Sequence, residues 1–249
     1  MDAGRMRQGK RLIIQSARLA ASQIFEPGFR GVLWKSLGLT LLLLTLAWIG
    51  LEAAISTWLV PYLQSWPWLA TAVLWLTGTG FVIGLGFLIG PVAAIFAGVF
   101  LDDVAELVEQ RHYPQDAPGR PMPLLPSMIL AVKFTLVVIA ANLLALALVL
   151  LPGINFTIFF FVNAWLIGRE YFQFAAMRFR PEAEAGAMRR TNSFTVFMAG
   201  LVIAGLMAVP ILNLLTPLFA TAMMVHMHKQ IALRDAQRAR RTPSRQAAG

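Results

Sequence analysis

The sequence predicts an all-α integral membrane protein with two long transmembrane helices, two short helical hairpins that penetrate the bilayer only half-way, and an N-terminal amphipathic helix. Hydrophobic residues make up 58% of the 249 residues and charged residues only 13%, whereas a soluble domain carries roughly 25% charged residues. The charges lie in a few blocks, and the turns at 61–67, 152–155 and 210–217 contain none. Three in-and-out hairpins would therefore place every charged segment on one side of the membrane.

The basic residues indicate which side that is. The net charge is +9, and the arginines and lysines gather in residues 1–35, 169–193 and 228–249. Basic segments face the cytoplasm, so both termini are expected there. A nucleic-acid-binding tail is the alternative, but a solvated tail near anionic lipid is favoured, and we expect no nucleic-acid partner. The absence of cysteine excludes disulfides and thiolate metal sites.

Residues 1–31 are the basic N-terminal segment, and an amphipathic helix is expected over 11–25. Two opposite stripes recur at helical spacing: Arg11, Gln15, Arg18 and Ser22 on one side, and Ile13, Ala17, Ala20 and Ile24 on the other. A basic amphipathic helix before a membrane segment typically lies in the headgroup region. Pro27-Gly28 then ends it.

The membrane domain is expected over 32–229 and opens with the hairpin 32–101. Its first span, 32–60, is longer than the ~30 Å hydrocarbon core at ~1.5 Å per residue, and the return begins near Trp68. The return is rich in glycine, which favours close helix packing over a direct substrate path.

Gly90-Pro91 is expected to kink this second helix. The helix then leaves the membrane as 91–111 and enters the cytoplasmic loop 102–123. In this part an acidic face opposes an apolar one: Asp102, Glu106 and Glu109 against Val104, Leu107 and Val108.

The two later hairpins, 124–168 and 194–227, flank the cytoplasmic loop 169–193. The returning arm of the first has about 14 residues, or ~20 Å, and 194–209 spans ~24 Å, so both are shorter than the ~30 Å core. Partial penetration is tolerated where the turn is buried in protein or lines a wet cavity, which implies packing against the long helices or other subunits. Residues 230–249 are expected to be a disordered basic tail.

An oxyanion site requires backbone N–H groups at a helix N-terminus together with one or two cations. Gly28, Arg30 and Lys35 meet this description. The alternative is that these cations only mark the cytoplasmic interface. Two ionisable residues lie within apolar spans, Lys133 and Glu52, and are candidates for a pathway. Snorkelling of Lys133 and an interfacial position of Glu52 are the simpler interpretations.

Other polar residues have structural interpretations. Arg169 and Glu170 are expected to form an interfacial pair, and Asn213, between Pro210 and Pro217, is expected to bond freed backbone rather than an ion. His226 and His228 should point to different faces, so no metal site is predicted. No nucleotide-binding or hydrolase motif is present. We therefore predict neither enzymatic activity nor a cofactor.

Several motifs, taken in order, carry a family resemblance. They are Asn163-Ala164-Trp165-Leu166-Ile167-Gly168-Arg169-Glu170-Tyr171-Phe172, Arg189-Arg190-Thr191-Asn192, Phe197-Met198-Ala199-Gly200, Pro210-Ile211-Leu212-Asn213 and Pro217. With Pro91, the acidic run 102–109 and Pro27-Gly28-Phe29-Arg30, this order resembles the CysZ-type sulfate permease family, which is related to the etoposide-induced protein family. The resemblance covers about residues 15–230.

The resemblance implies two long transmembrane helices, two half-penetrating hairpins and a homo-oligomer in the bacterial inner membrane. It also implies transport of sulfate or a similar oxyanion by a channel or permease. In the family a Gly-x-Arg turn before the first long helix is associated with sulfate, and here it corresponds to Gly28 and Arg30, followed by Gly31 instead of a second arginine. The alternatives are a non-transporting scaffold or interaction protein of the same fold and, less favoured, a lipid-modifying enzyme.

Overall fold

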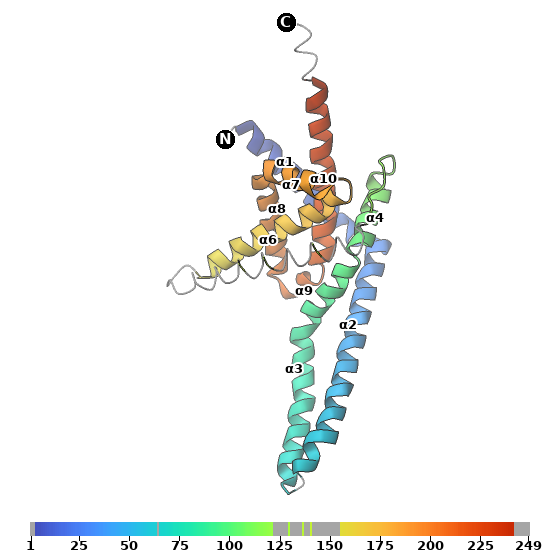
Figure 1. The fold of residues 1–249 in the computed structure, drawn as a ribbon, viewed down its shortest axis with the longest axis vertical. Coiled ribbons are helices and arrows are strands. Elements are labelled where there is room, and N and C mark those ends of the chain that lie inside the picture. Colours follow the sequence, from blue (N-terminus) through green and yellow to red (C-terminus); the bar gives the residue numbers. More distant parts are fainter. Residues whose placement is uncertain are drawn as a thin grey trace. The chain divides into compact units, whose positions relative to one another are not determined.

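A computed structural model describes residues 3–63, 65–121, 129, 136, 140 and 155–241, and every regular element in this part of the chain is helical. The all-α fold is therefore confirmed. The chain divides into two compact units, one formed by Met1–Phe29 with Leu101–Gly249 and the other by Arg30–Phe100 (Figure 1).

The Arg30–Phe100 unit is a hairpin of two long helices that run side by side (Figure 1). Its elements are α2 (Pro27–Ala54), a π-helical turn (Ile55–Leu59), a 3-10 turn (Val60–Leu63) and α3 (Pro67–Val99). Two helical stretches, of 37 and 19 residues, are long and apolar enough to cross a membrane. In the most apolar 18-residue segment of each, only 6% and 0% of the residues are buried. The hairpin predicted over 32–101 corresponds to these two helices, and its bounds within a membrane stay a prediction. Both helices begin at a proline, which suits a first helical turn.

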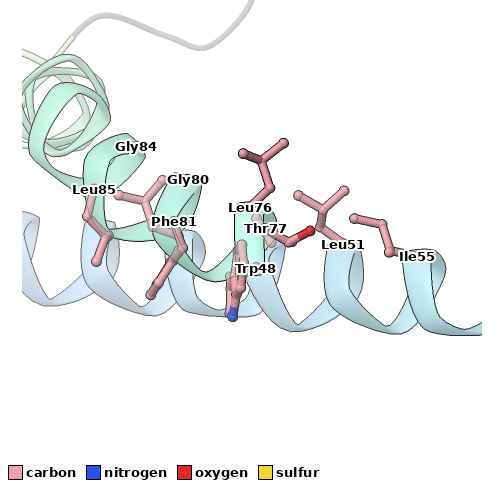
Figure 2. A pocket seen from close by; sticks show the side chains of 11 residues that line it. Trp48, Leu51, Ile55, Leu76, Thr77, Gly80, Phe81, Gly84 and Leu85 are labelled. Atoms are coloured by element: carbon pink, nitrogen blue, oxygen red, sulfur yellow. The ribbon is translucent and has the colours of Figure 1, made fainter. Parts of the chain in front are cut away.

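A groove of about 380 Å³ runs between α2 and α3. Figure 2 shows its apolar lining, in which the rings of Trp48 and Phe81 stack with centroids 4.5 Å apart. The glycines of α3 do not all serve close packing among the described residues, because a side-chain carbon added at Gly78 or Gly80 would meet none of these within 4 Å. The helix stays continuous through Pro91 and ends at Val99, so the exit helix predicted over 91–111 is two helices rather than one.

The other unit is built around α10 (Thr216–Arg241), which contacts the helices that surround it. These are α1 (Ala3–Gln23), α4 (Leu101–His112), α6 (Asn155–Met177) and α8 (Ser193–Met207). Residues 216–229 are buried without interruption, as expected of a helix enclosed on all sides. The short α7 (Glu182–Thr191) and α9 (Pro210–Asn213) complete the described part of this unit.

Helix α1 contains the predicted amphipathic helix but begins earlier, at Ala3. Its buried face is Leu12, Ser16, Ala20 and Gln23, which is displaced by about one residue from the predicted apolar stripe. This face packs within the protein, since α1 contacts α10 and α8. The position of the opposite, arginine-bearing face in the headgroup region stays a prediction.

Helix α6 contradicts the predicted end of the second hairpin at Gly168. It has 23 residues, about 34 Å, and continues through Arg169 and Glu170. The charges did not end the helix because arginine and glutamate both favour helix. The Arg169 guanidinium lies 5.9 Å from the ring centroid of Trp165, one turn earlier. The predicted loop 169–193 is therefore mostly helix. The first arm of this hairpin, 124–154, lies almost entirely outside the described residues.

The last hairpin has unequal arms. Helix α8 has 15 residues, about 22 Å, close to the predicted arm, whereas α10 has 26 residues, about 39 Å. Residues 230–241, predicted to be disordered, continue α10 because alanine, leucine, glutamine and arginine favour helix. Taken together, α7 and α8 are also long and apolar enough for one membrane span, although they are bent by 88° as in a broken span or re-entrant loop. Half-way insertion stays a prediction.

Helices α6 and α8 approach each other backbone to backbone. A side-chain carbon added at Gly200 would lie 2.0 Å from the Ala164 carbonyl oxygen, and one added at Gly168 would lie 2.6 Å from that of Val196. Only glycine fits at such a contact. Gly168 therefore allows helix packing and is not a helix stop.

Candidate functional site

The predicted anion-binding residues lie in the first turns of α2. Its first N–H groups have no acceptor within the helix, as an anion site requires. A side-chain carbon added at Gly28 would lie 2.9 Å from Cδ2 of Leu107, so α4 packs against this turn and a larger residue would require the Leu107 side chain to shift. Phe29 is buried and Arg30 is exposed. Gly28 and Arg30 are thus placed together at one helix end.

The other candidates are not brought to this place. Lys35 is exposed but lies five residues after Arg30, about 140° around the helix axis. Glu52 is exposed near the far end of α2. Lys133 lies outside the described residues. The pathway roles of Glu52 and Lys133 stay predictions.

A buried polar chain that the sequence did not predict fixes the end of α1, four residues before α2 begins. The Gln23 side chain bonds Nδ1 of His112 at 2.7 Å and Nε2 of His226 at 3.1 Å, and the Tyr113 hydroxyl bonds Nδ1 of His226 at 2.9 Å. One assignment satisfies all three bonds with neutral rings: Tyr113 donates to His226, His226 Nε2–H donates to the Gln23 oxygen, and the Gln23 amide donates to His112.

The polar chain ties three helices to the loop that follows α4. Gln23 belongs to α1, His112 to α4 and His226 to α10. Burial, and secondarily the charge of Asp116, raises the pKa of Tyr113 to about 12, so its hydroxyl keeps the proton that it donates. The chain therefore holds the α1 terminus in place without any net charge.

A charged cluster lies around Arg178, just after α6. Its Nε donates to Oε1 of Glu109 at 2.7 Å and its Nη2 to Oε2 at 3.3 Å, while Nη1 bonds Asp102. Arg178 and Glu109 are 5% and 4% exposed. Glu109, predicted to share an acidic face with Asp102 and Glu106, is therefore buried, and a two-pronged guanidinium contact compensates for the burial of its charge.

The loop 113–121 is anchored to this cluster and to α10. The Gly119 N–H donates to Oε2 of Glu109 at 2.8 Å, and the Arg120 N–H donates to the Arg178 carbonyl at 2.8 Å. Lys229 bonds Asp116 at 2.9 Å, and its ammonium lies 4.1 Å from the centroid of the Phe179 ring. The proline-rich loop is thus ordered by side chains distant in sequence.

His228 is the buried polar residue least accounted for. Its ring stacks on Phe179 with centroids 5.0 Å apart and meets Phe172 edge-on. Neither ring nitrogen has a hydrogen-bond partner within the described part of the chain. Burial, and then the charges of Arg180 and Lys229, lowers its pKa to about 3. His228 is therefore neutral at physiological pH.

Metal ligation is not suggested by these residues. Both nitrogens of His226 are engaged in the polar chain, and His228 lies among aromatic rings. Within the described residues, no three His, Asp or Glu side chains gather as a metal site requires.

Comparison with known protein families matches residues 17–217 to "Sulfate transporter CysZ/Etoposide-induced protein 2.4". The chain belongs to this family. A comparison with curated proteins found no match. The matched part of the CysZ/etoposide-induced protein sequence includes Gly28 and Arg30, whereas the α10 residues His226, His228 and Lys229 follow its end.

The remaining motif residues of this CysZ-family chain have structural positions. Pro210 is the first residue of α9, and Pro217 is the second of α10, where a missing N–H is tolerated. The backbone N–H of Asn213 donates to the Val209 carbonyl at 2.8 Å. The Leu212 carbonyl accepts from the Thr216 hydroxyl at 3.4 Å, so threonine supplies the backbone bond that we expected from the Asn213 side chain.

Proposed function

We propose that this protein passes sulfate or a similar oxyanion across the bacterial inner membrane as a channel or permease, with both termini in the cytoplasm. The observation that carries the proposal is the position of Gly28 and Arg30, at the start of a 37-residue apolar stretch within a chain of the sulfate transporter family. The basic segments support the orientation, because positive charge stays on the cytoplasmic side.

The chemistry of recognition follows from the helix end. The first N–H groups of α2 point toward the cytoplasmic end of the helix and carry about half a positive charge through the helix dipole. The exposed Arg30 side chain adds a planar fork that bonds two oxygens of a tetrahedral oxyanion. The polar chain at Gln23 stabilises this end by fixing the helix that precedes it.

The pathway requires more helices than α2 and α3 alone. In their most apolar segments only 6% and 0% of the residues are buried, and the groove between the two helices is lined by apolar side chains. A doubly charged oxyanion cannot cross along such a surface, because no group there replaces its water. We therefore propose a homo-oligomer whose subunits enclose the pathway together with the rest of the chain. The proposal involves neither enzymatic activity nor a cofactor.

The binding site is tested by calorimetry with sulfate and the purified protein in detergent. Arg30→Ala should weaken binding by roughly tenfold to a hundredfold, the value of a charge-assisted hydrogen bond. Lys35→Ala is the matched control because it removes a cation from the other side of the same helix, and it should change the affinity by less than about fivefold. Equal effects of the two substitutions would show that only general positive charge matters.

A scaffold or interaction protein of the same fold is the alternative. The 88° bend between α7 and α8 favours this alternative, because a re-entrant helix pair inserts into one leaflet and shapes it. Sulfate flux into liposomes separates the two functions, since a scaffold gives no flux above that of empty vesicles.

A further inference from the structure

Three side chains form a stripe along α6, at spacings of four residues: Trp165, Arg169 and Gln173. Residues so spaced lie on one face of a helix. The Arg169 guanidinium lies 5.9 Å from the ring centroid of Trp165, which orients this cation along the helix surface.

Helix α7 brings a second arginine to the stripe. Nε of Arg189 donates to Oε1 of Gln173 at 3.3 Å, and Nε2 of Gln173 donates to the Glu182 carbonyl at 3.3 Å. Gln173 therefore holds Arg189 one helical turn from Arg169. Arg190, the next residue, is exposed. Two helices thus place Arg169, Arg189 and Arg190 close together, and we call these three residues the arginine cluster.

The acidic side chains of the described residues form no ion pair with the arginine cluster. Within the described residues, the ion pairs involve Arg178 and Lys229 and none of these three arginines. Burial, opposed by the charge of Arg169, raises the pKa of Glu170 to about 7, so Glu170 is only partly ionised near neutral pH. Burial and then the charges of Arg169 and Arg190 lower the pKa of Arg189, which reflects the crowding of like charges.

Exposed aromatic side chains continue the stripe away from the arginine cluster. Phe161 and Trp165 are 45% and 46% exposed and lie about two turns and one turn before Arg169, respectively. Phe161 also lies near Phe197 of α8, with ring centroids 6.2 Å apart. A free oxyanion would need only the arginines, whereas a cationic site beside an exposed aromatic surface matches a molecule with an anionic head and an apolar tail.

We propose that the arginine cluster binds the phosphate group of an anionic phospholipid, with an acyl chain lying along Trp165 and Phe161. Arginine suits phosphate because its fork bonds two oxygens at once. Aromatic side chains suit the boundary between headgroups and hydrocarbon because one end is apolar and the other tolerates water. The arginine cluster shares no residue with the proposed anion site of Gly28 and Arg30, and its lipid binding does not depend on the proposed transport.

The test measures lipid binding to the full-length protein in detergent by native mass spectrometry, with phosphatidylglycerol and phosphatidylcholine as probes. Phosphatidylglycerol should bind more tightly, and the double substitution Arg169→Gln, Arg189→Gln should weaken it by roughly thirtyfold, since each cation near anionic lipid contributes about a kcal/mol. Arg111→Gln, which removes an exposed arginine of α4, is the control and should leave binding unchanged. Equal binding of the two lipids, or no loss in the double variant, would overturn the proposal.

Two further experiments distinguish a site for a phospholipid from a site for a free oxyanion. Inorganic phosphate should not displace phosphatidylglycerol at millimolar concentration, and Trp165→Gln should weaken the lipid. If phosphate displaces the lipid and Trp165→Gln has no effect, the cluster is a free-oxyanion site and the proposal fails. Should the double variant not fold, Arg190→Gln removes an exposed arginine at the end of α7 and is expected to weaken phosphatidylglycerol alone by about fivefold.

Discussion

The contact between α6 and α8 predicts a large effect of a single methyl group. In Gly200→Ala the new carbon would lie 2.0 Å from the Ala164 carbonyl oxygen, although ordinary contact begins near 3.4 Å. The neighbour is backbone and cannot rotate away, so the two helices must separate. We expect a loss of about 3 kcal/mol, the upper end of the usual cost of overpacking. At 2–4 °C per kcal/mol for a chain of this size, the melting temperature should fall by roughly 6–12 °C.

The assay is thermal unfolding in detergent, followed by circular dichroism and by the monodisperse fraction on gel filtration. Gly205→Ala is the matched control because it lies in the same helix and its added carbon would meet no described residue within 4 Å. Alanine favours helix over glycine by roughly 0.5–1 kcal/mol, so this control should be as stable as the native protein or slightly more. Equal melting temperatures for the two variants would refute the close approach of α6 and α8.

Two further predictions concern buried polar groups. The unfolded state binds a proton at His228 below pH 6.5 and the folded state does not until about pH 3, so this residue should cost about 2 kcal/mol of stability between pH 6.5 and 5. The free energy of unfolding of His228→Phe relative to the native protein should therefore be about 2 kcal/mol higher at pH 5 than at pH 7.5. An equal difference at both pH values would contradict the burial of the ring. Arg178→Met leaves the buried Glu109 without its cation and should cost about 3–5 kcal/mol in thermal unfolding. The double variant Arg178→Met, Glu109→Met should recover much of that loss, and a double variant no more stable than the single one would argue against the direct pair.

The long apolar hairpin could be predicted from the sequence because hydropathy is a local property. No charge other than Glu52 lies between Lys35 and Asp102, so the length of this apolar segment was enough to predict two spans and the turn between them. Pro210 and Pro217 likewise indicated the ends of helices, because proline has no N–H to contribute.

The core of the other unit could not be predicted because its decisive contacts are distant in sequence. Arg178 and Glu109 are 69 residues apart, and Gln23 and His226 are 203 apart. A charged residue after an apolar run is typical of the start of a loop, so the sequence predicted that the hairpin ends at Gly168. In the structure α6 continues to Met177. The spacing of the small residues Ala164 and Gly168, four positions apart, was the signal that could have indicated helix packing.

The basic C-terminal region shows a related limit. Composition alone favoured disorder over 230–249, yet α10 continues to Arg241. Extending a helix that is already formed costs far less than starting one, and the buried residues 216–229 form that helix.

The central claim, oxyanion transport, is tested most directly by the uptake of radiolabelled sulfate into liposomes that contain the purified protein. We predict uptake above that of protein-free liposomes, inhibition by unlabelled oxyanions of similar shape, and reduced uptake by Arg30→Ala at equal protein content. Uptake equal to that of empty liposomes, from protein that remains folded and inserted, would contradict the account and favour a scaffold.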